Sequence, residues 1–479
     1  MPLLSSPPIS SYLVKNDTDL FKLLLSPEFL IQKFFADFSI SQSKGVDRLN
    51  GFQFSGRAAG QLSIASIKCL SGEYRFSPYL ENLKVKGRGK EPRLISIPCI
   101  RDRVVLNQLN IFLARIFPEC VPRNIANSYV REISADLAKH PPETTFICGC
   151  DIQKFYDAIK RDNLIKVLSS RIKCPEALAL IRHALDTPTV PKNTLRSSYS
   201  SYRNPCGVPQ GLAISNILAA IYLSDVDAAM HKFPIKYYRY VDDVLMYGAE
   251  DVLRKARSSL MARLRSRGLT LHGVNSNKSH FAPLAKDFGY LGYRFSWPKI
   301  TVRDSTIERL LQSLAAKFSD YSHNKAKRLE RFKYLDEKRL AEIFILELNE
   351  RITGAISENK RFGWIAYFSQ ITDLKLLHHL DATVERLFLR MEDFNRKAPA
   401  SLKKFRRAFF EMRFNPTGGY VRNYDIISTS PEKLSFLMER GRVDPLDAPL
   451  TDDQINERFE RYRRRVLSEM HADEADIYG

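Results

Sequence analysis

Apolar residues in the first part of the chain recur at the spacing of helices. They do so over residues 21–67, with a break in the Gly- and Ser-containing stretch 41–56. Residues 82–98 instead form two short apolar runs around the polar segment 87–90, which predicts a basic β-hairpin. The helical period returns over residues 102–117. The pattern therefore predicts a helical N-terminal extension, a hairpin and a further helix.

The middle of the chain alternates between strand and helix patterns. Residues 145–151 predict a strand, and residues 155–168 predict a helix. A Pro- and Ser-rich loop at 187–209 leads into a helix of small residues at 213–231.

Acidic residues occupy the tip of the next predicted hairpin. Its strands are residues 235–240 and 244–247, on either side of Val241-Asp242-Asp243. An amphipathic helix at 251–267 and the start of a short strand at 269–271 follow. The order strand, helix, helix, hairpin, helix, strand is that of a split βαβ layer, an antiparallel sheet backed by helices on one face.

Beyond Trp297 the pattern becomes almost wholly helical. Residues 307–318 and 340–356 are the clearest amphipathic stretches. Positive charge also concentrates in this part, which is typical either of a solvated helical face or of a nucleic-acid track. The residues concerned are Arg386, Arg390, Arg396, Lys397, Lys403, Lys404, Arg406, Arg407 and Arg413.

Composition narrows the class of protein. The 479 residues are 44% hydrophobic and 27% charged, which is typical of a globular chain with two or three packed units. Lys and Arg number 74 against 54 Asp and Glu, and this surplus favours a polyanionic partner such as nucleic acid. A basic protein that is merely soluble, or one bound to an anionic membrane surface, is the alternative. No stretch approaches the roughly 20 apolar residues of a spanning helix, and no signal-peptide pattern begins the chain.

The cysteines argue against a zinc module and a disulfide framework. There are seven, all in the first half of the chain, and none forms a CxxC pair. We therefore expect a reducing, cytoplasmic location.

The predicted layout gathers carboxylates at one edge of the sheet. The strand that ends at Asp151 would lie beside the hairpin that carries Asp242 and Asp243. Phosphoryl transfer to a primer hydroxyl uses one metal ion to activate the attacking oxygen and another to stabilise the leaving pyrophosphate. Magnesium takes hard oxygen ligands, which carboxylates supply. By itself, however, an Asp-Asp pair is more typical of a turn.

Five motifs resemble those of reverse transcriptases. Residues 150–157 (CDIQKFYD) resemble the first catalytic motif, and residues 207–211 (GVPQG) with Ser215-Asn216 are similar to the second. Tyr240-Val241-Asp242-Asp243 matches the YxDD box. Asn277-Lys278-Ser279 and Tyr290-Leu291-Gly292-Tyr293 resemble the lysine motif and the primer grip. The five occur in the family order over about 140 residues, which makes a chance match improbable.

The resemblance implies an RNA-directed DNA polymerase that adds dNTPs to a DNA or RNA primer on an RNA template. Two Mg²⁺ ions, or Mn²⁺ in their place, would be held by Asp151, Asp242 and Asp243, with Asp243 contributing least to direct coordination. Tyr156 occupies the steric-gate position, where an aromatic ring would crowd a ribose 2′-OH. Its alternative role is a core tyrosine at the start of a helix.

The resemblance also assigns residues to the substrates. Gln210 would lie under the incoming nucleotide, and Arg93 would clamp the triphosphate, helped by Lys84 or Lys86 from the opposite strand. Lys278 would protonate the leaving pyrophosphate, although an exposed loop lysine would look the same in sequence.

The implied architecture is an α+β right-hand polymerase with a ferredoxin-like palm and mainly α-helical extensions at both ends. We expect an N-terminal extension and fingers in residues 1–142, a palm in 143–295, and a helical thumb with a basic C-terminal extension in 296–479. Such a thumb would hold a primer-template duplex by shape and phosphate contacts.

The wording of the second motif is closest to one branch of the family. VPQGLAISN followed by LAAIYL, with the later segments 351–354 (RITG) and 362–364 (FGW) and the pair Leu380-Asp381, resembles bacterial abortive-infection and defence-associated enzymes of the "unknown group" class. Group II intron and retron reverse transcriptases are more distant. This resemblance implies antiphage defence, with a dedicated noncoding RNA as one option for the template. Untemplated or protein-primed synthesis, and an RNA-binding or maturase-like scaffold, remain the alternatives.

Overall fold

The structure is a computed structural model that describes residues 15–85, 91–122, 126–273, 278–444 and 449–474. The chain divides into unit one, residues 1–123 and 150–281, and unit two, residues 124–149 and 282–479. The limits 1–142, 143–295 and 296–479 for the polymerase subdomains stay a prediction. No helix in the described ranges has the length and apolar character needed to cross a membrane.

Unit one begins with helices whose first turns are capped by side chains. Asn16 accepts the amide of Asp19 at 2.8 Å, and Ser26 caps the second helix, where a proline occupies the first turn. The predicted break at 41–56 contains a short helix, whose first turn is stabilised by the capping box of Asn50 and Gln53. The elements are α1 (Asp17–Leu24), α2 (Pro27–Lys33), which continues as a π-helix (Phe34–Phe38), α3 (Gly51–Ser55), α4 (Ala58–Leu70) and α5 (Ile100–Ile116).

The predicted basic hairpin is confirmed. β1 (Tyr79–Lys84) pairs antiparallel with β2 (Arg93–Ile97), so that Lys84 lies opposite Arg93. A two-residue strand, β4 (Thr189–Val190), adds to β1 in parallel. The turn predicted at 87–90 and Lys86 lie outside the described residues.

The helix predicted at 155–168 is interrupted. It forms α7 (Phe155–Ala158) and α8 (Arg161–Arg171), with Ile159 and Lys160 extended between them. The break occurs because the carbonyl of Ile159 accepts the amide of Gly207 at 2.8 Å instead of a helical amide. The remaining helices of unit one are α9 (Pro175–Asp186), α10 (Ser215–Met230) and α11 (Glu250–Ser266).

A four-stranded sheet has the order β5-β6-β3-β7. Its strands are β3 (Phe146–Asp151), β5 (Lys236–Tyr240), β6 (Asp243–Gly248) and β7 (His280–Pro283). β5 and β6 form the predicted antiparallel hairpin, with Tyr240 opposite Asp243, and α11 packs against β6. β3 lies beside this hairpin, which confirms the split βαβ arrangement. The strand predicted to begin at 269–271 is wrong, because the segment makes only an isolated bridge between Leu271 and Ile152.

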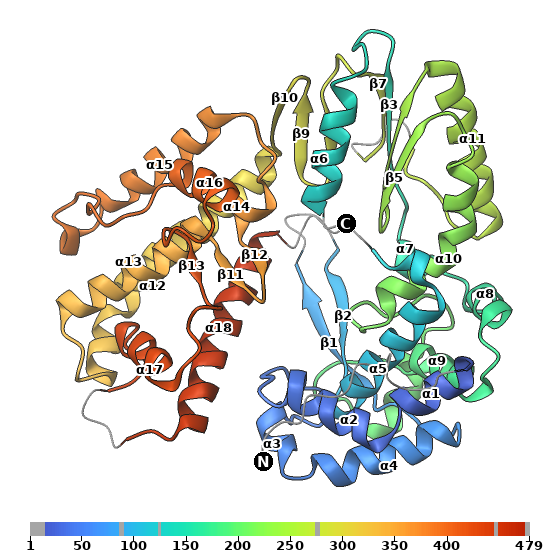
Figure 1. The fold of residues 1–479 in the computed structure, drawn as a ribbon, viewed down its shortest axis with the longest axis horizontal. Helices are drawn as coiled ribbons and strands as arrows, with labels where there is room; N and C mark the ends of the chain where they lie inside the picture. The colour runs from blue at the N-terminus through green and yellow to red at the C-terminus, as the bar shows by residue number, and fades with distance from the viewer. Residues whose placement is uncertain (1–14, 86–90, 123–125, 274–277, 445–448, 475–479) are drawn as a thin grey trace. The chain divides into compact units, whose positions relative to one another are not determined.

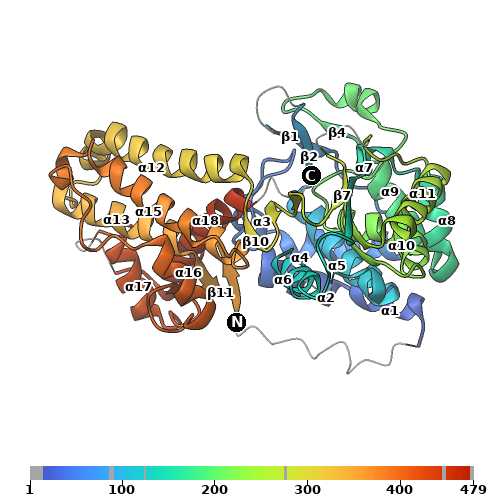
Figure 2. The same cartoon turned by 90° about the horizontal axis from the view of Figure 1, so that it is seen from above.

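Unit two combines a β-meander with packed helices. The meander consists of β8 (Phe288–Tyr290), β9 (Tyr293–Ser296) and β10 (Lys299–Val302), in the order β10-β9-β8. The predicted amphipathic stretches lie in α12 (Asp304–Arg331) and α13 (Glu337–Thr353), and Figure 2 shows α12 lying lengthwise along one side of unit two. α13 ends at Gly354, where φ is +70° and a Cβ atom would lie 2.2 Å from the carbonyl oxygen of Phe362.

The prediction that the chain beyond Trp297 is almost wholly helical is wrong for β10 and for a further small sheet. A small sheet of order β12-β11-β13 interrupts the helices. Its strands are β11 (Ala355–Ser357), β12 (Lys360–Phe362) and β13 (Arg422–Asn423). The helices are α6 (Ala126–Leu137), α14 (Trp364–Tyr367), α15 (Leu374–Phe388), α16 (Phe405–Phe414), α17 (Ser430–Glu439) and α18 (Asp452–Glu474), all coloured in Figure 1 by their place in the chain.

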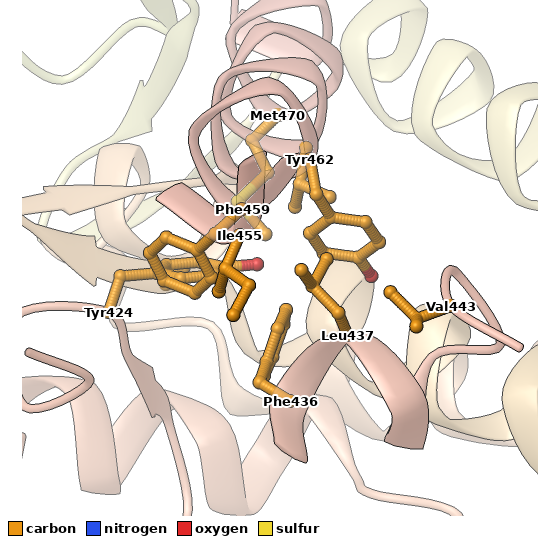
Figure 3. Close-up of a cluster of buried hydrophobic side chains, with 10 residues drawn as sticks. Tyr424, Phe436, Leu437, Val443, Ile455, Phe459, Tyr462 and Met470 are labelled. Carbon is orange, nitrogen blue, oxygen red and sulfur yellow. The ribbon is translucent and has the colours of Figure 1, made fainter. Parts of the chain in front are cut away.

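α17 and α18 close a core of their own. Figure 3 shows side chains of both helices converging with Tyr424. The buried apolar members are Ala355, Tyr424, Phe436, Leu437, Val443, Ile455, Phe459, Tyr462, Val466 and Met470. At about 1.5–3 kcal/mol for each large buried side chain, such a cluster stabilises the docking of α18 strongly.

A buried ion pair accompanies this core. Arg440 Nη2 donates to Glu350 Oε1 at 2.6 Å, and the hydroxyls of Tyr424 and Tyr462 lie 3.3 and 3.4 Å from Glu350 Oε2. Burial raises the pKa of Glu350, while Arg440 opposes the rise. Every oxygen of this carboxylate therefore has a partner within unit two.

Candidate active site

Two of the three predicted carboxylates lie together in unit one. Asp151 ends β3, and Asp242 lies in the turn between β5 and β6. The amide of Ile152 donates to the carbonyl of Asp242 at 3.1 Å, which joins the two segments next to the side chains. Burial, and then the charge of Asp151, raise the pKa of Asp242. The two carboxylates repel each other in a partly buried place, and a cation between or beside them would relieve this repulsion.

Two nitrogen-bearing side chains approach Asp151. Lys278 Nζ lies 2.7 Å from Asp151 Oδ2, and His272 Nε2 lies 3.2 Å from the same oxygen. The backbone amide of His272 also donates to the carbonyl of Asp151 at 3.0 Å. Lys278 was predicted at the site, whereas His272 was missed, because a lone histidine in a loop carries no sequence signal. Asn277, from the same motif, lies outside the described residues.

Asp243 is the first residue of β6, whereas Asp242 lies in the turn before it. In the described ranges, no three His, Cys, Asp or Glu side chains form a group that could hold a metal ion. The site therefore offers Asp151 and Asp242. Magnesium is commonly held by one or two carboxylates together with waters and substrate phosphates, so this donor set fits it. A role for Asp243 stays a prediction.

Arg239 supports the tip of the acidic hairpin. Val241 has a φ of +58°, which is strained for a β-branched residue, and Arg239 Nη1 donates to its carbonyl at 2.9 Å. Arg239 Nε donates to Asp227 on α10 at 2.7 Å, as does the hydroxyl of Tyr237. The partly buried Arg239–Asp227 pair thus supports the turn that carries Asp242. Sequence reasoning missed both residues.

The second predicted motif packs on the first. Gly207 has a φ of +80°, and a Cβ atom there would lie 2.9 Å from the carbonyl oxygen of Tyr156. The amide of Val208 donates to that carbonyl at 2.8 Å, and the amide of Ser96 on β2 donates to the carbonyl of Gln210 at 2.7 Å. The loop that carries Gln210 is therefore held between α7 and the hairpin.

Asp242 is coupled electrostatically to Tyr156 and to Arg93. Burial, and then Asp242, raise the pKa of Tyr156, whose hydroxyl donates to Asn216 Oδ1 at 2.6 Å. Arg93 lowers the pKa of Asp242. Arg93 Nε is buried and has no hydrogen-bond partner among the described residues, so a donor is available for a phosphate oxygen. Lys84 lies opposite Arg93 in the hairpin.

The predicted primer grip lies in unit two. Tyr290 ends β8 and Tyr293 begins β9, and Leu291 and Gly292 form the turn with φ of +48° and +81°. Both tyrosine rings are buried, and the hydroxyl of Tyr293 donates to the carbonyl of Tyr367 at 2.6 Å. Their contact with a primer stays a prediction.

Residues 85–295 match the family model described as reverse transcriptase (RNA-dependent DNA polymerase). Over 246 residues the chain is 31% identical to an uncharacterized 91 kDa protein in the cob intron of Schizosaccharomyces pombe, covering 47% of this chain and 29% of that protein. It is 24% identical over 226 residues to protein YkfC of Escherichia coli, covering 44% of this chain and 57% of YkfC. The chain thus spans less than two thirds of either relative.

Solved structures that match part of the chain include telomerases. The truncated apo telomerase from Candida tropicalis is 16% identical with a TM-score of 0.38, covering 48% of this chain and 55% of that one. Telomerase from Candida albicans in complex with a fragment of telomeric RNA is 12% identical with a TM-score of 0.41, covering 72% of this chain and 68% of that one.

Proposed function

We propose that this chain, whose residues 85–295 are a reverse transcriptase domain, is an enzyme that synthesises DNA on an RNA template. The predicted family and the predicted α+β right-hand polymerase fold are confirmed by the match of this domain. The observation that supports the activity is the placement of Asp151 beside Asp242. The repulsion between the two carboxylates favours binding of a cation at this place.

The residues around this pair suit nucleotidyl transfer. Asp151 and Asp242 would hold divalent magnesium, or manganese in its place, which when bound activates the primer hydroxyl and stabilises the leaving pyrophosphate. Lys278, which reaches Asp151 at 2.7 Å, would donate a proton to that pyrophosphate. Arg93 would bind a phosphate of the dNTP through its unpaired Nε. The ring of Tyr156 would exclude a ribose 2′-OH, and Gln210 would lie beneath the base.

Substrate partners follow from the chemistry. A net charge of +20 suits an RNA template and a DNA or RNA primer. We further propose a cytoplasmic role in antiphage defence, with a dedicated noncoding RNA as template. The wording of the second motif, VPQGLAISN, supports this role.

Primer extension tests the activity. Purified protein with a labelled primer, an RNA template, dNTPs and Mg²⁺ should extend the primer, and omission of one dNTP should stop extension at the matching template base. Asp242→Asn should lower the rate about 10²–10³-fold, because the charge that holds the metal is lost. Asp251→Asn removes an exposed carboxylate from the first turn of α11 and serves as the matched control. Equal extension by wild type and Asp242→Asn would contradict the proposal.

The defence role needs a separate experiment. Nucleic acid that copurifies with the protein from cells would be sequenced before and after phage infection. A single recurrent noncoding RNA, with complementary DNA appearing on infection, is the expected result. DNA that enters the aqueous phase of a phenol extraction only after protease treatment would instead indicate protein priming.

A further inference from the structure

One face of α16 exposes two large aromatic side chains. Phe410 is 43% exposed and Phe414 is 70% exposed. Their ring centroids lie 6.4 Å apart with an interplanar angle of 21°, so the rings are stacked. Adjacent exposed phenylalanines usually mark a binding surface, since leaving them in water has a free-energy cost.

Guanidinium groups flank these rings. Arg413 lies 5.3 Å from the ring centroid of Phe414, and Arg406 and Arg407 are exposed one turn before. Neither Arg406 nor Arg413 has a carboxylate partner among the described residues, whereas Arg407 pairs with Glu411 at 3.2 Å. We call Arg406, Arg407, Phe410, Arg413 and Phe414 the α16 surface.

The α16 surface is not needed to fold the helix. Ala408, Phe409 and Met412 are buried and hold the inner face of α16. The first turn is capped from α15, where Asp381 accepts the amide of Phe405 at 2.6 Å. Arg407 also lies 4.4 Å from the ring centroid of Tyr420, and Arg406 lies near His378, whereas the rings of Phe410 and Phe414 stay largely in solvent.

We propose that the α16 surface binds single-stranded RNA. Exposed rings give bases a place to stack, and flanking guanidiniums pair with the phosphates between those bases. A second copy of this chain fits poorly, because two such basic faces would repel each other. The choice of single-stranded RNA as the ligand rests on the proposed function. Newly made DNA stays paired with its template, so the strand that remains unpaired is the RNA template.

Binding of a labelled RNA tests the α16 surface directly. Fluorescence anisotropy would measure the dissociation constant of full-length protein for an unstructured RNA of about 20 nucleotides. The double variant Phe410→Ala/Phe414→Ala should bind at least about tenfold more weakly, because two stacking platforms are lost. Leu389→Ala/Ile426→Ala is the matched control, since these side chains are 60% and 70% exposed in the same unit. An equal dissociation constant for wild type and the phenylalanine variant would overturn the proposal.

Two further measurements separate stacking from charge. Wild type and the phenylalanine variant should bind an abasic RNA backbone equally well, because no base remains to stack. Arg406→Ala/Arg407→Ala/Arg413→Ala should reduce the slope of log affinity against log salt by about 2, the value for three phosphate contacts on a single strand. An unchanged slope, or a phenylalanine effect that persists on the abasic backbone, would contradict the proposal.

Crosslinking identifies the occupant during synthesis. Ultraviolet irradiation of the full chain on its primer and RNA template, followed by mass spectrometry, should place a ribonucleotide adduct on the peptide that contains Phe410. A deoxyribonucleotide adduct there, or self-association lost only in the phenylalanine variant, would overturn RNA as the occupant. If wild type extends primers but wild type and the phenylalanine variant bind RNA with the same dissociation constant, only the α16 proposal fails. If wild type does not extend primers while the phenylalanine variant still loses RNA affinity, only the polymerase proposal fails.

Discussion

Two carboxylates, the partly buried Asp242 in unit one and the buried Glu350 in unit two, have a pKa raised by desolvation, yet their surroundings differ. Glu350 has Arg440 at 2.6 Å and two tyrosine hydroxyls nearby, so its charge is compensated within the fold. The charge of a second carboxylate, Asp151, raises the pKa of Asp242; Arg93 lowers it, and Lys278 pairs with Asp151 rather than with Asp242. The first arrangement is complete without a ligand, whereas the second calls for a cation from solution. Burial alone therefore does not distinguish a structural carboxylate from a functional one, and the partners do.

Removal of Arg440 is expected to have the largest effect on stability. Arg440→Met leaves the buried Glu350 with only the longer pair to Arg422 at 3.6 Å, which should lower the free energy of unfolding by about 3–5 kcal/mol. Thermal or urea unfolding would measure the loss. Arg461→Met is the control, because its pair with Glu457 is exposed on α18 and contributes at most about 0.5 kcal/mol. A loss in Arg440→Met no larger than in the control would show that the pair is not needed.

Magnesium should stabilise unit one through the other carboxylate pair. At free Mg²⁺ about 100-fold above its dissociation constant, wild type should gain about 2.7 kcal/mol, which a rise in the unfolding temperature would report. Asp151→Asn and Asp242→Asn should lose this gain. Arg440→Met should keep it, although its starting stability is lower. If Mg²⁺ stabilises Asp242→Asn as much as wild type, Asp242 does not bind the cation, and the contrast with Glu350 is contradicted.

Arg239 is paired within the fold and also supports the turn that carries Asp242. Its variant therefore tests whether a structural ion pair affects catalysis. Arg239→Lys keeps a positive charge beside Asp227 but loses the fork that also reaches the carbonyl of Val241. We expect kcat to fall about tenfold, because the turn that holds Asp242 shifts, with the KM for dNTP unchanged. Arg254→Lys, on the exposed face of α11, is the control. A change in KM alone would contradict a positioning role.

The sequence pattern predicted the elements that frame the site better than the contacts within it. The hairpin β1–β2 and the helices α5, α10 and α11 have strong periodicity, and the split βαβ order placed Asp151 beside Asp242. The break between α7 and α8 could not be predicted, because it depends on a hydrogen bond to Gly207, far along the chain.

Other features carry too little pattern to be read from one sequence. The strands β11, β12 and β13 are two or three residues long, and a stretch that short shows no alternation. His272 and Arg239 act through tertiary contacts, so nothing in their neighbours marks them. The proposed functions of Arg93, Tyr156, Gln210, Lys278 and the segment 290–293 stay predictions that substrate-bound measurements would test.

The smallest effect concerns the stability of the metal-free site and its dependence on pH. The folded pKa of Asp242 is raised by burial and then by Asp151, so the protonated form favours the folded state, and that contribution is lost as pH rises through the folded pKa. In EDTA at neutral pH, Asp242→Asn should therefore unfold at a slightly higher temperature than wild type. The difference should shrink as pH falls and Asp242 takes up its proton.

Asp251→Asn provides the control for this difference, since Asp251 is an exposed carboxylate on α11. The Asp251→Asn variant should show no such advantage in unfolding temperature at neutral pH, because this carboxylate is exposed to water. An Asp242→Asn protein that is less stable than wild type in EDTA at neutral pH would mean that Lys278, His272 and Arg93 already compensate both carboxylates. The site would then resemble that of Glu350, and the demand for a cation from solution would no longer separate the two regions.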